Sequence, residues 1–260
     1  MLVGDIMSKN PLYVAEDDFI IKARQLIRDN HLRGLPVMND EGHVTGIVTI
    51  QDMLKIASTR SNVTVAGFTR EVPLITEDCE AEVAAKNLLN ERCAILPVVE
   101  SHEERHLVGV VSPIDIFKSI DPEKMPKKTI AEIMNTNVVT CSPQDLVTRV
   151  WNKMLEEDFT GIPVLDEKGE TMGIITRFDV LKRGGSRIGR DERVKSKDIM
   201  KVEKLMHTPL YNLRPEDSLH HAADIMSKRD IGRISVVDDD KLIGIVDRYD
   251  LIKAFLGEDE

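Results

Sequence analysis

The sequence lacks the features that mark several large classes of protein. Aromatic residues make up 4% of its 260 residues, and no apolar run approaches the roughly 20 residues that a membrane-spanning helix needs. The three cysteines, Cys79, Cys93 and Cys141, lie far apart, without the paired spacing of a zinc site or a disulfide framework. Cys93 adjoins the apolar run 94–96, so we predict that it is buried. No basic flank followed by an apolar block opens the chain, so we expect a cytoplasmic location.

Motifs of catalysis are also lacking. No nucleophile, base and orienting acid occur in a recognisable pattern, and there is neither a Walker loop nor a dinucleotide-binding fingerprint. His220 and His221 are adjacent on a predicted helix and point about 100° apart, so they cannot share a metal ion. His102 and His106 flank a charged turn. They could bind a metal ion together, but the polarity of the turn explains their presence equally well. The sequence therefore predicts a protein that is not an enzyme and holds no metal.

Basic residues are too few to cover the surface. The chain has 45 acidic and 35 basic residues and a net charge of -10, which argues against a protein whose whole surface binds nucleic acid. The segment 183–197 is different, because it is glycine-rich and locally basic. We interpret it as a solvated connector, and a phosphate-contacting strap or an RNA-contacting arm remains an alternative.

What the sequence does contain is a fourfold internal repeat. One short phrase recurs at 46–52, 109–115, 173–179 and 244–250. It consists of glycine, two aliphatic residues, Thr or Ser, and an aspartate three positions later; in the last copy Asp247 replaces the Thr or Ser. An aliphatic residue, proline and valine precede it at 35–37, 96–98 and 162–164, with Ser235 replacing the proline at 234–236. The residues 29 positions before each proline or Ser235 are Met7, Phe68, Met134 and Met206. The repeat predicts four units, at 1–60, 61–120, 121–183 and 184–260.

The pattern within one copy predicts the order strand, helix, strand, strand, helix. In the third copy, the β-rich run 137–140 precedes a helix start at 142–143, where serine caps and proline occupies the first helical position. Residues 161–165 and 171–176 are predicted strands joined by a polar turn, and a second helix opens near Asp179. The fold class expected is α/β, built of α+β repeats.

One copy alone would leave a face of its three-stranded sheet bare. We therefore expect the copies to pair into two modules, residues 1–120 and 121–260. The segment 119–129 between them carries two prolines and several charges, as is typical of an exposed linker.

The recurring phrase has both a structural and a functional interpretation. Thr49 and Asp52, placed after a strand and before an apolar helix, form a capping box, in which the hydroxyl accepts from the third backbone N–H and the acid reaches back. The same holds for Ser112 with Asp115 and for Thr176 with Asp179. A helix N-terminus also attracts phosphate, and a carboxylate one turn in can accept both hydroxyls of a ribose. Small residues beside each central strand would let a flat base approach the backbone: Gly34, Ala94, Gly161 and Gly232.

These residues together resemble the cystathionine β-synthase (CBS) domain, over about residues 2–256. The resemblance implies two paired modules, often called Bateman modules, as in the γ regulatory subunit of AMP-activated protein kinase and in stand-alone prokaryotic CBS proteins. It implies adenosine ligands such as AMP, ADP, ATP or S-adenosylmethionine, with ribose held by Asp52, Asp115, Asp179 and Asp250. Phosphate would face Thr49, Ser112, Thr176, Arg177, Arg33 and Arg233. The base would lie against Gly34, Leu35, Pro36, Gly161, Ile162, Pro163, Gly232 and Ile234.

The fourth copy departs from this pattern. Asp247 would place a second carboxylate beside a bound phosphate, and two like charges about 4 Å apart cost on the order of 4 kcal/mol at an effective dielectric constant of about 20. We expect that this site stays empty, is neutralised by Arg248 or Arg233, or prefers a ligand with less negative charge. The second copy begins irregularly, with 66–68 in place of the usual Asp-Ile-Met.

The sequence thus predicts a non-enzymatic sensor of adenine nucleotides, in which two CBS pairs form a flat disk and the ligand biases how the modules pack. The alternatives are an S-adenosylmethionine sensor, favoured by Asp247 beside Asp250, and a nucleic-acid-associated regulator that uses 183–197. Hidden catalysis is the weakest alternative. The expected partners are an unidentified target protein and a second disk, with no membrane contact.

Overall fold

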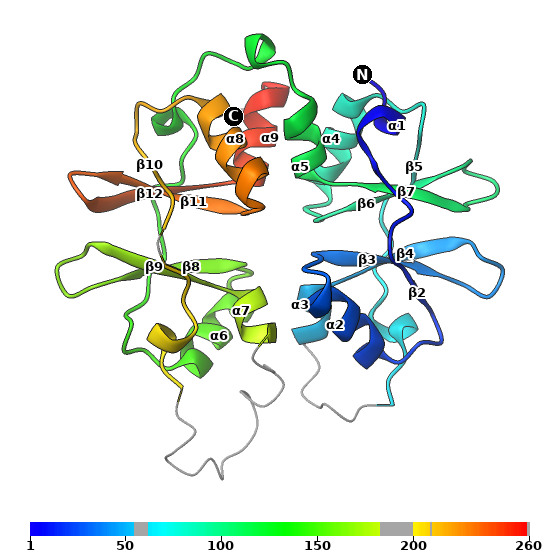
Figure 1. Ribbon diagram of the computed structural model, residues 1–260, viewed down its shortest axis with the longest axis horizontal. Helices are drawn as coiled ribbons and strands as arrows, with labels where there is room; N and C mark the ends of the chain where they lie inside the picture. The colour runs from blue at the N-terminus through cyan, green and yellow to red at the C-terminus, as the bar shows by residue number, and fades with distance from the viewer. Residues whose placement is uncertain (55–61, 183–199, 209, 259–260) are drawn as a thin grey trace.

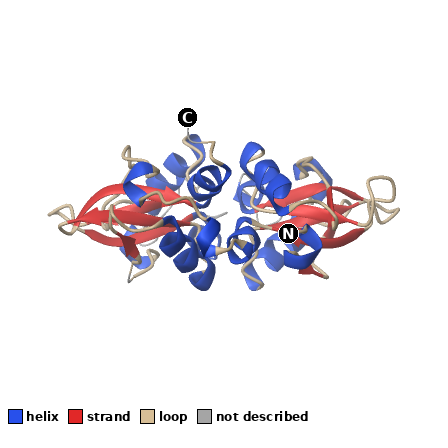
Figure 2. Cartoon of the chain, turned by 90° about the horizontal axis from the view of Figure 1, so that it is seen from above, coloured by secondary structure: helices blue, strands red, loops and turns tan. Residues whose placement is uncertain are grey.

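The computed structural model describes residues 1–54, 62–182, 200–208 and 210–258 (Figure 1). The basic segment 183–197 and the interpretations placed on it lie outside these residues. Four α/β repeats occupy the four quarters of a flattened molecule, whose helices gather in the middle while its strands extend toward both ends (Figure 2).

The first module contains the first two copies. The first copy comprises α1 (Val3–Ile6), β1 (Ser8–Lys9), β2 (Val14–Ala15), α2 (Ile20–Asp29), β3 (Gly34–Met38), β4 (Val44–Thr49) and α3 (Ile50–Leu54). The second comprises η1 (Val65–Phe68), β5 (Ile75–Thr76), α4 (Ala81–Asn90), β6 (Leu96–Val99), β7 (Leu107–Val111) and α5 (Pro113–Ser119). In each copy a parallel pair of strands, β2 with β3 or β5 with β6, is extended by an antiparallel hairpin, as predicted.

The second module follows η2 (Pro122–Lys124) and has the same organisation. The third copy comprises η3 (Ile130–Glu132), α6 (Val147–Glu156), β8 (Gly161–Leu165), β9 (Thr171–Thr176) and α7 (Arg177–Lys182). The fourth comprises η5 (Val202–Lys204), β10 (Asn212–Leu213), α8 (Leu219–Arg229), β11 (Arg233–Asp238), β12 (Lys241–Asp247) and α9 (Arg248–Leu256).

Two expectations for the third copy are wrong. The run 137–140 forms no strand, and a single parallel bridge joins Cys141 to Val164 instead. The first helix begins at Val147 rather than at 143, because Asp145 accepts a hydrogen bond from the Ser142 N–H at 2.8 Å and closes a turn there. Carbonyl groups of this turn accept hydrogen bonds from backbone N–H groups of η5, so the turn contacts the fourth copy.

The two copies of a module exchange their leading segments, which we define as residues 7–9, 68–70, 134–136 and 206–208. Each leading segment pairs with the last strand of the other copy. The paired positions are Ser8 with Val110, Arg70 with Ile47, Asn135 with Ile245, and His207 with Ile174. This exchange joins copy one to copy two and copy three to copy four, and it confirms the predicted pairing.

The recurring glycine of the repeat makes this exchange possible. A Cβ atom on Gly109 or Gly244 would collide with the sulfur atom of Met7 or Met134. On Gly173 it would lie 2.8 Å from the carbonyl oxygen of His207. The first and last anchors of the sequence repeat therefore contact each other between copies, and glycine is required where the backbones approach closely.

The modules contact each other through their helices. Helix α5 packs on α8 and α4 on α9, so that copies two and four share one hydrophobic core that includes Leu96 and Ile234. Helix α3 packs on α7, and Leu181 of α7 belongs to the core of copy one. Copy one therefore faces copy three, and copy two faces copy four. Cys93 is fully buried in the shared core, as predicted.

Candidate functional site

The aspartate of each recurring phrase turns back onto the end of the preceding strand. One carboxylate oxygen accepts the backbone N–H three residues earlier, at 2.9 Å for Thr49 and Asp52, 2.8 Å for Ser112 and Asp115, 2.8 Å for Thr176 and Asp179, and 2.7 Å for Asp247 and Asp250. In the first three copies the hydroxyl group also donates to that oxygen, at 2.7, 2.6 and 2.6 Å. The acid half of the predicted capping box is confirmed in every copy, and each acid is held in one orientation by the same backbone bond. The hydroxyl half is present as well for Ser112 with Asp115 and for Thr176, whose hydroxyl accepts the Asp179 N–H at 3.4 Å.

The fourth copy uses its extra acid to cap α9. Asp247 Oδ1 accepts the N–H groups of Tyr249 at 2.8 Å and Asp250 at 3.2 Å, so this carboxylate occupies amides that a phosphate group would otherwise meet. Burial, reinforced by the charge of Asp247, raises the pKa of Asp250 to about 7. The positive charge of Arg233 acts in the opposite direction. Arg233 therefore offsets part of the negative charge of this acid pair.

Arg248 is used elsewhere, in an ion cluster that joins the two modules. It is 5% exposed and donates to Ile231 O at 3.1 Å and to Asp230 Oδ1 at 3.1 Å. Arg33 from copy one donates to the same carboxylate oxygen at 3.0 Å and to the Asp230 carbonyl at 2.6 Å. Burial, together with the charge of Arg33, lowers the pKa of Arg248 to about 9.

A similar cluster lies between copies one and three. Arg177 is 4% exposed and donates to Met154 O and to Asp158 Oδ1, both at 2.8 Å. Gln51 from copy one donates to the same Asp158 oxygen at 2.8 Å. Copy one thus supplies a donor to an aspartate in each copy of the second module.

Arg233 crosses from copy four to copy three. Its guanidinium donates to Gly161 O at 2.7 Å and to the hydroxyl of Thr160. A Cβ atom on Gly161 would lie 3.3 Å from Arg233 Cδ, so this small residue provides space for the arginine side chain.

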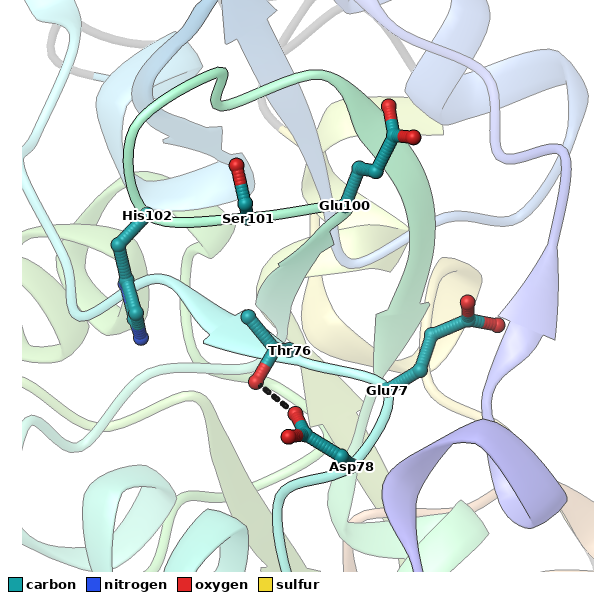
Figure 3. A pocket seen from close by; sticks show the side chains of 6 residues that line it. All are labelled: Thr76, Glu77, Asp78, Glu100, Ser101 and His102. Carbon is teal, nitrogen blue, oxygen red and sulfur yellow. Dashed lines mark hydrogen bonds between the residues drawn. The ribbon is translucent and has the colours of Figure 1, made fainter.

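Two surface depressions lie away from these phrases. One, of about 440 Å³, is lined by Thr76, Glu77, Asp78, Glu100, Ser101 and His102 (Figure 3). Its three carboxylates would repel phosphate, and the Thr76 hydroxyl donates to Asp78. The other, of about 380 Å³, lies between the linker and the start of α8, next to Lys127 and His220. Among the described residues, there is no cluster of three or more His, Cys, Asp or Glu side chains that could bind a metal ion. None of the helices described there combines the length and apolar character that crossing a bilayer demands.

Comparison with known protein families matches the CBS domain four times, over residues 3–59, 65–122, 130–185 and 202–257. The protein belongs to the CBS domain family. We name its copies CBS1 to CBS4 in chain order. CBS domain proteins are regulatory sensors of adenosine-derived ligands, which assigns the chain to this general class.

Relatives occur in archaea. MJ1404 of Methanocaldococcus jannaschii is 26% identical over 96% of this chain, which spans 61% of the length of MJ1404. MJ1225 of the same organism is 24% identical over 91% of this chain and 92% of its own length. The crystal structure of MJ1225, described as a proposed archaeal homolog of g-AMPK, superposes with a TM-score of 0.81 at 23% identity, covering 98% of this chain and all of that one. A conserved protein from Pyrococcus horikoshii gives 0.69 at 22% identity over the same shares of the two chains. These structures share the fold.

The predicted site residues fall into two groups. Each of the four acids lies at the junction of a last strand and a second helix, beside Thr49, Ser112 or Thr176 in CBS1 to CBS3. The arginines lie at contacts between copies, as described above. The predicted base-contacting residues of CBS1 and CBS3 are buried: Gly34, Leu35, Pro36, Gly161, Ile162 and Pro163. Ile234 is buried as well, whereas Gly232 is partly exposed and faces the side chains of Arg33 and Arg248.

Asp158 and Asp230 are not among the predicted site residues, although the repeat carries a signal for them. Both stand five residues before the proline position, where all four copies adopt positive φ; the other two residues are His31 and Arg92. Only CBS3 and CBS4 combine aspartate here with arginine directly after the Thr or Asp of the recurring phrase. This co-occurrence within one chain indicates the two ion clusters.

Replacing Asp230 with asparagine should destabilise the protein by about 1 to 2 kcal/mol. Asparagine retains the shape and tolerates the φ of 51° at this position, but it leaves the buried guanidinium of Arg248 without its carboxylate. Because the Asp230 side chain is 62% exposed, solvent screens part of this cost. Urea unfolding measures the difference. The exposed Asp238→Asn is the control, and equal stability of the two variants would contradict the proposed contribution of the cluster.

Proposed function

We propose that this protein is a non-catalytic sensor that binds adenine nucleotides, AMP, ADP or ATP, at the aspartates of its CBS domains. The observation that supports this is the repeated orientation of Asp52, Asp115 and Asp179. One oxygen of each carboxylate caps the strand end beside a hydroxyl group, so the other oxygen is the one that ribose hydroxyls would meet. The neighbouring Thr or Ser hydroxyl would then face phosphate.

The ion clusters suggest how binding would be transmitted. Arg33, a predicted phosphate contact, holds Asp230 in the opposite module. A phosphate that attracted Arg33 would weaken this contact and change the packing of the modules. Because a ligand shifts such an equilibrium only through its different affinities for the two packings, AMP and ATP would be distinguished by how their phosphates engage such arginines.

Asp179→Ala should weaken one nucleotide-binding event and leave the others unchanged. The alanine cannot accept the ribose hydroxyls, and a lost hydrogen-bonded charge reduces affinity by at least tenfold. Titration calorimetry with AMP and with ATP measures both stoichiometry and Kd.

The matched control is Asp166→Ala, which removes an acid from the hairpin turn of the same CBS domain. Circular dichroism would verify that both variants are folded. If neither nucleotide binds the unaltered protein, or if Asp179→Ala binds them unchanged, the proposed function is wrong.

CBS4 supports a second candidate ligand, S-adenosylmethionine. Asp247 already caps the amides at the start of α9 and adds negative charge next to Asp250. This arrangement favours an adenosine derivative that lacks phosphate and carries a cationic sulfonium group. Calorimetry with S-adenosylmethionine decides between the candidates, since binding lost in Asp250→Ala but retained in Asp179→Ala would assign this ligand to CBS4.

A further inference from the structure

His207 lies directly at the acid of CBS3, although it comes from the leading segment of CBS4. Its backbone exchanges two hydrogen bonds with Ile174 on β9, at 2.8 and 3.2 Å, and these place the side chain next to the start of α7. The imidazole Nε2 contacts Asp179 Oδ1. Two consecutive copies therefore build this site together.

His207 contacts Oδ1 of Asp179, the carboxylate oxygen that does not cap the end of β9. Asp179 Oδ2 accepts from the backbone N–H of Thr176 at 2.8 Å and from its hydroxyl at 2.6 Å. The Asp179 side chain is 4% exposed, so few other directions of approach remain, whereas the His207 side chain is 66% exposed. We propose that His207 competes with ribose hydroxyls for Asp179 Oδ1 and thereby gates the CBS3 site. This proposal rests on the proposed function, because it concerns ligand binding at the same acid.

Among the four sites, only CBS3 has a histidine at this position of the exchanged leading segment. The residues that pair with the equivalent position of the last strand at the other sites are Ser8, Arg70 and Asn135. Arg70 directs its guanidinium to the carbonyl oxygen of Glu91, at 3.1 Å. Asn135 uses its side-chain oxygen to accept the N–H of Asn137 at 2.8 Å, within its own segment. A ligand that enters CBS3 would therefore have to displace an imidazole from the aspartate, and no other copy has histidine at this position.

Opening the gate requires only a side-chain movement. The backbone of His207 is paired to β9, while its imidazole faces solvent over most of its surface. Rotation about χ1 would move the imidazole away from Asp179 without separating the exchanged segment, and exposed side chains change rotamer rapidly. The gate would thus lower the affinity for adenosine ligands without preventing their entry.

His207→Asn tests the gate, because asparagine is the residue that CBS3 itself has at this position. Without the competing imidazole, the Kd for adenosine at the CBS3 site should fall about fivefold to tenfold. The Kd for 2′,3′-dideoxyadenosine should stay unchanged, since this compound lacks the hydroxyls for which His207 competes. Titration calorimetry measures both, and His220→Asn, on an exposed position of α8, is the control.

A double-mutant cycle assigns the effect to the proposed pair, since the gain from His207→Asn must vanish when Asp179 is already alanine. Unchanged or weaker adenosine binding by His207→Asn would overturn the gate. If adenosine binds wild type, binds more weakly at one site in Asp179→Ala and is unaffected by His207→Asn, the proposed function stands and the gate fails. If adenosine binds neither wild type nor His207→Asn, the proposed function and the gate both fail.

Discussion

Replacement of Gly46 with alanine is expected to lower the free energy of unfolding by about 3 kcal/mol. The added Cβ would lie 2.9 Å from the carbonyl carbon of Arg70, in the leading segment of CBS2. This backbone cannot withdraw easily, because Arg70 and Ile47 exchange two hydrogen bonds of 2.9 Å. The change should therefore loosen the contact between CBS1 and CBS2. Urea unfolding measures the loss of stability.

Gly67→Ala is the matched control in the same module. A Cβ there would approach only Val63, at 3.9 Å, so we expect a change within about 0.5 kcal/mol. Equal stability of the two variants would show that the leading segment of CBS2 does not lie against Gly46 in solution.

The titration of Asp250 should make stability fall as the pH rises from 5 to 8. Its folded-state pKa of about 7 lies above the value of about 3.9 expected in the unfolded chain, so the folded protein binds this proton more tightly. The corresponding stabilisation is complete below about pH 4 and is lost as the pH rises through 7. Over the range 5 to 8, wild type should lose on the order of 2 kcal/mol more than Asp250→Asn. Unfolding at several pH values measures this difference.

Asp247→Asn separates the two causes of this shift. Burial would remain, but the charge of Asp247 would be gone, so the pKa of Asp250 should fall and the loss of stability should move to lower pH. The carbon-13 shift of the Asp250 carboxyl group follows the titration directly. A carboxyl that titrates near pH 4 in wild type would contradict the prediction.

The repeated unit itself could be predicted because its signals are local. The change from strand to helix, the capping acid and the polar hairpin turn all depend on residues within a few positions of one another, and the structure retains them in each copy. The helix start in CBS3 was mispredicted for a non-local reason. The turn at Ser142 and Asp145 bonds to η5, which is almost 60 residues away in the sequence.

The surroundings of the candidate site depend on contacts between copies. The guanidinium of Arg33 lies on Asp230, 197 residues away, and that of Arg233 lies on CBS3. His207 could not be connected with Asp179 from the sequence, because nothing local indicates which copy receives a leading segment. The glycine that marks the receiving strand was recognised in every copy, but its function as space for another copy was not.

The amino-acid sequence alone thus determined the fourfold repeat, the α/β order of each unit and the position of one acid at every strand-to-helix junction, since these follow from periodicity and capping over short distances. The tertiary structure decided which copies exchange segments, which arginines join the modules and which side chain contacts Asp179. These outcomes depend on the packing of surfaces that are distant in the chain, where shape and charge are set only once all four copies are assembled.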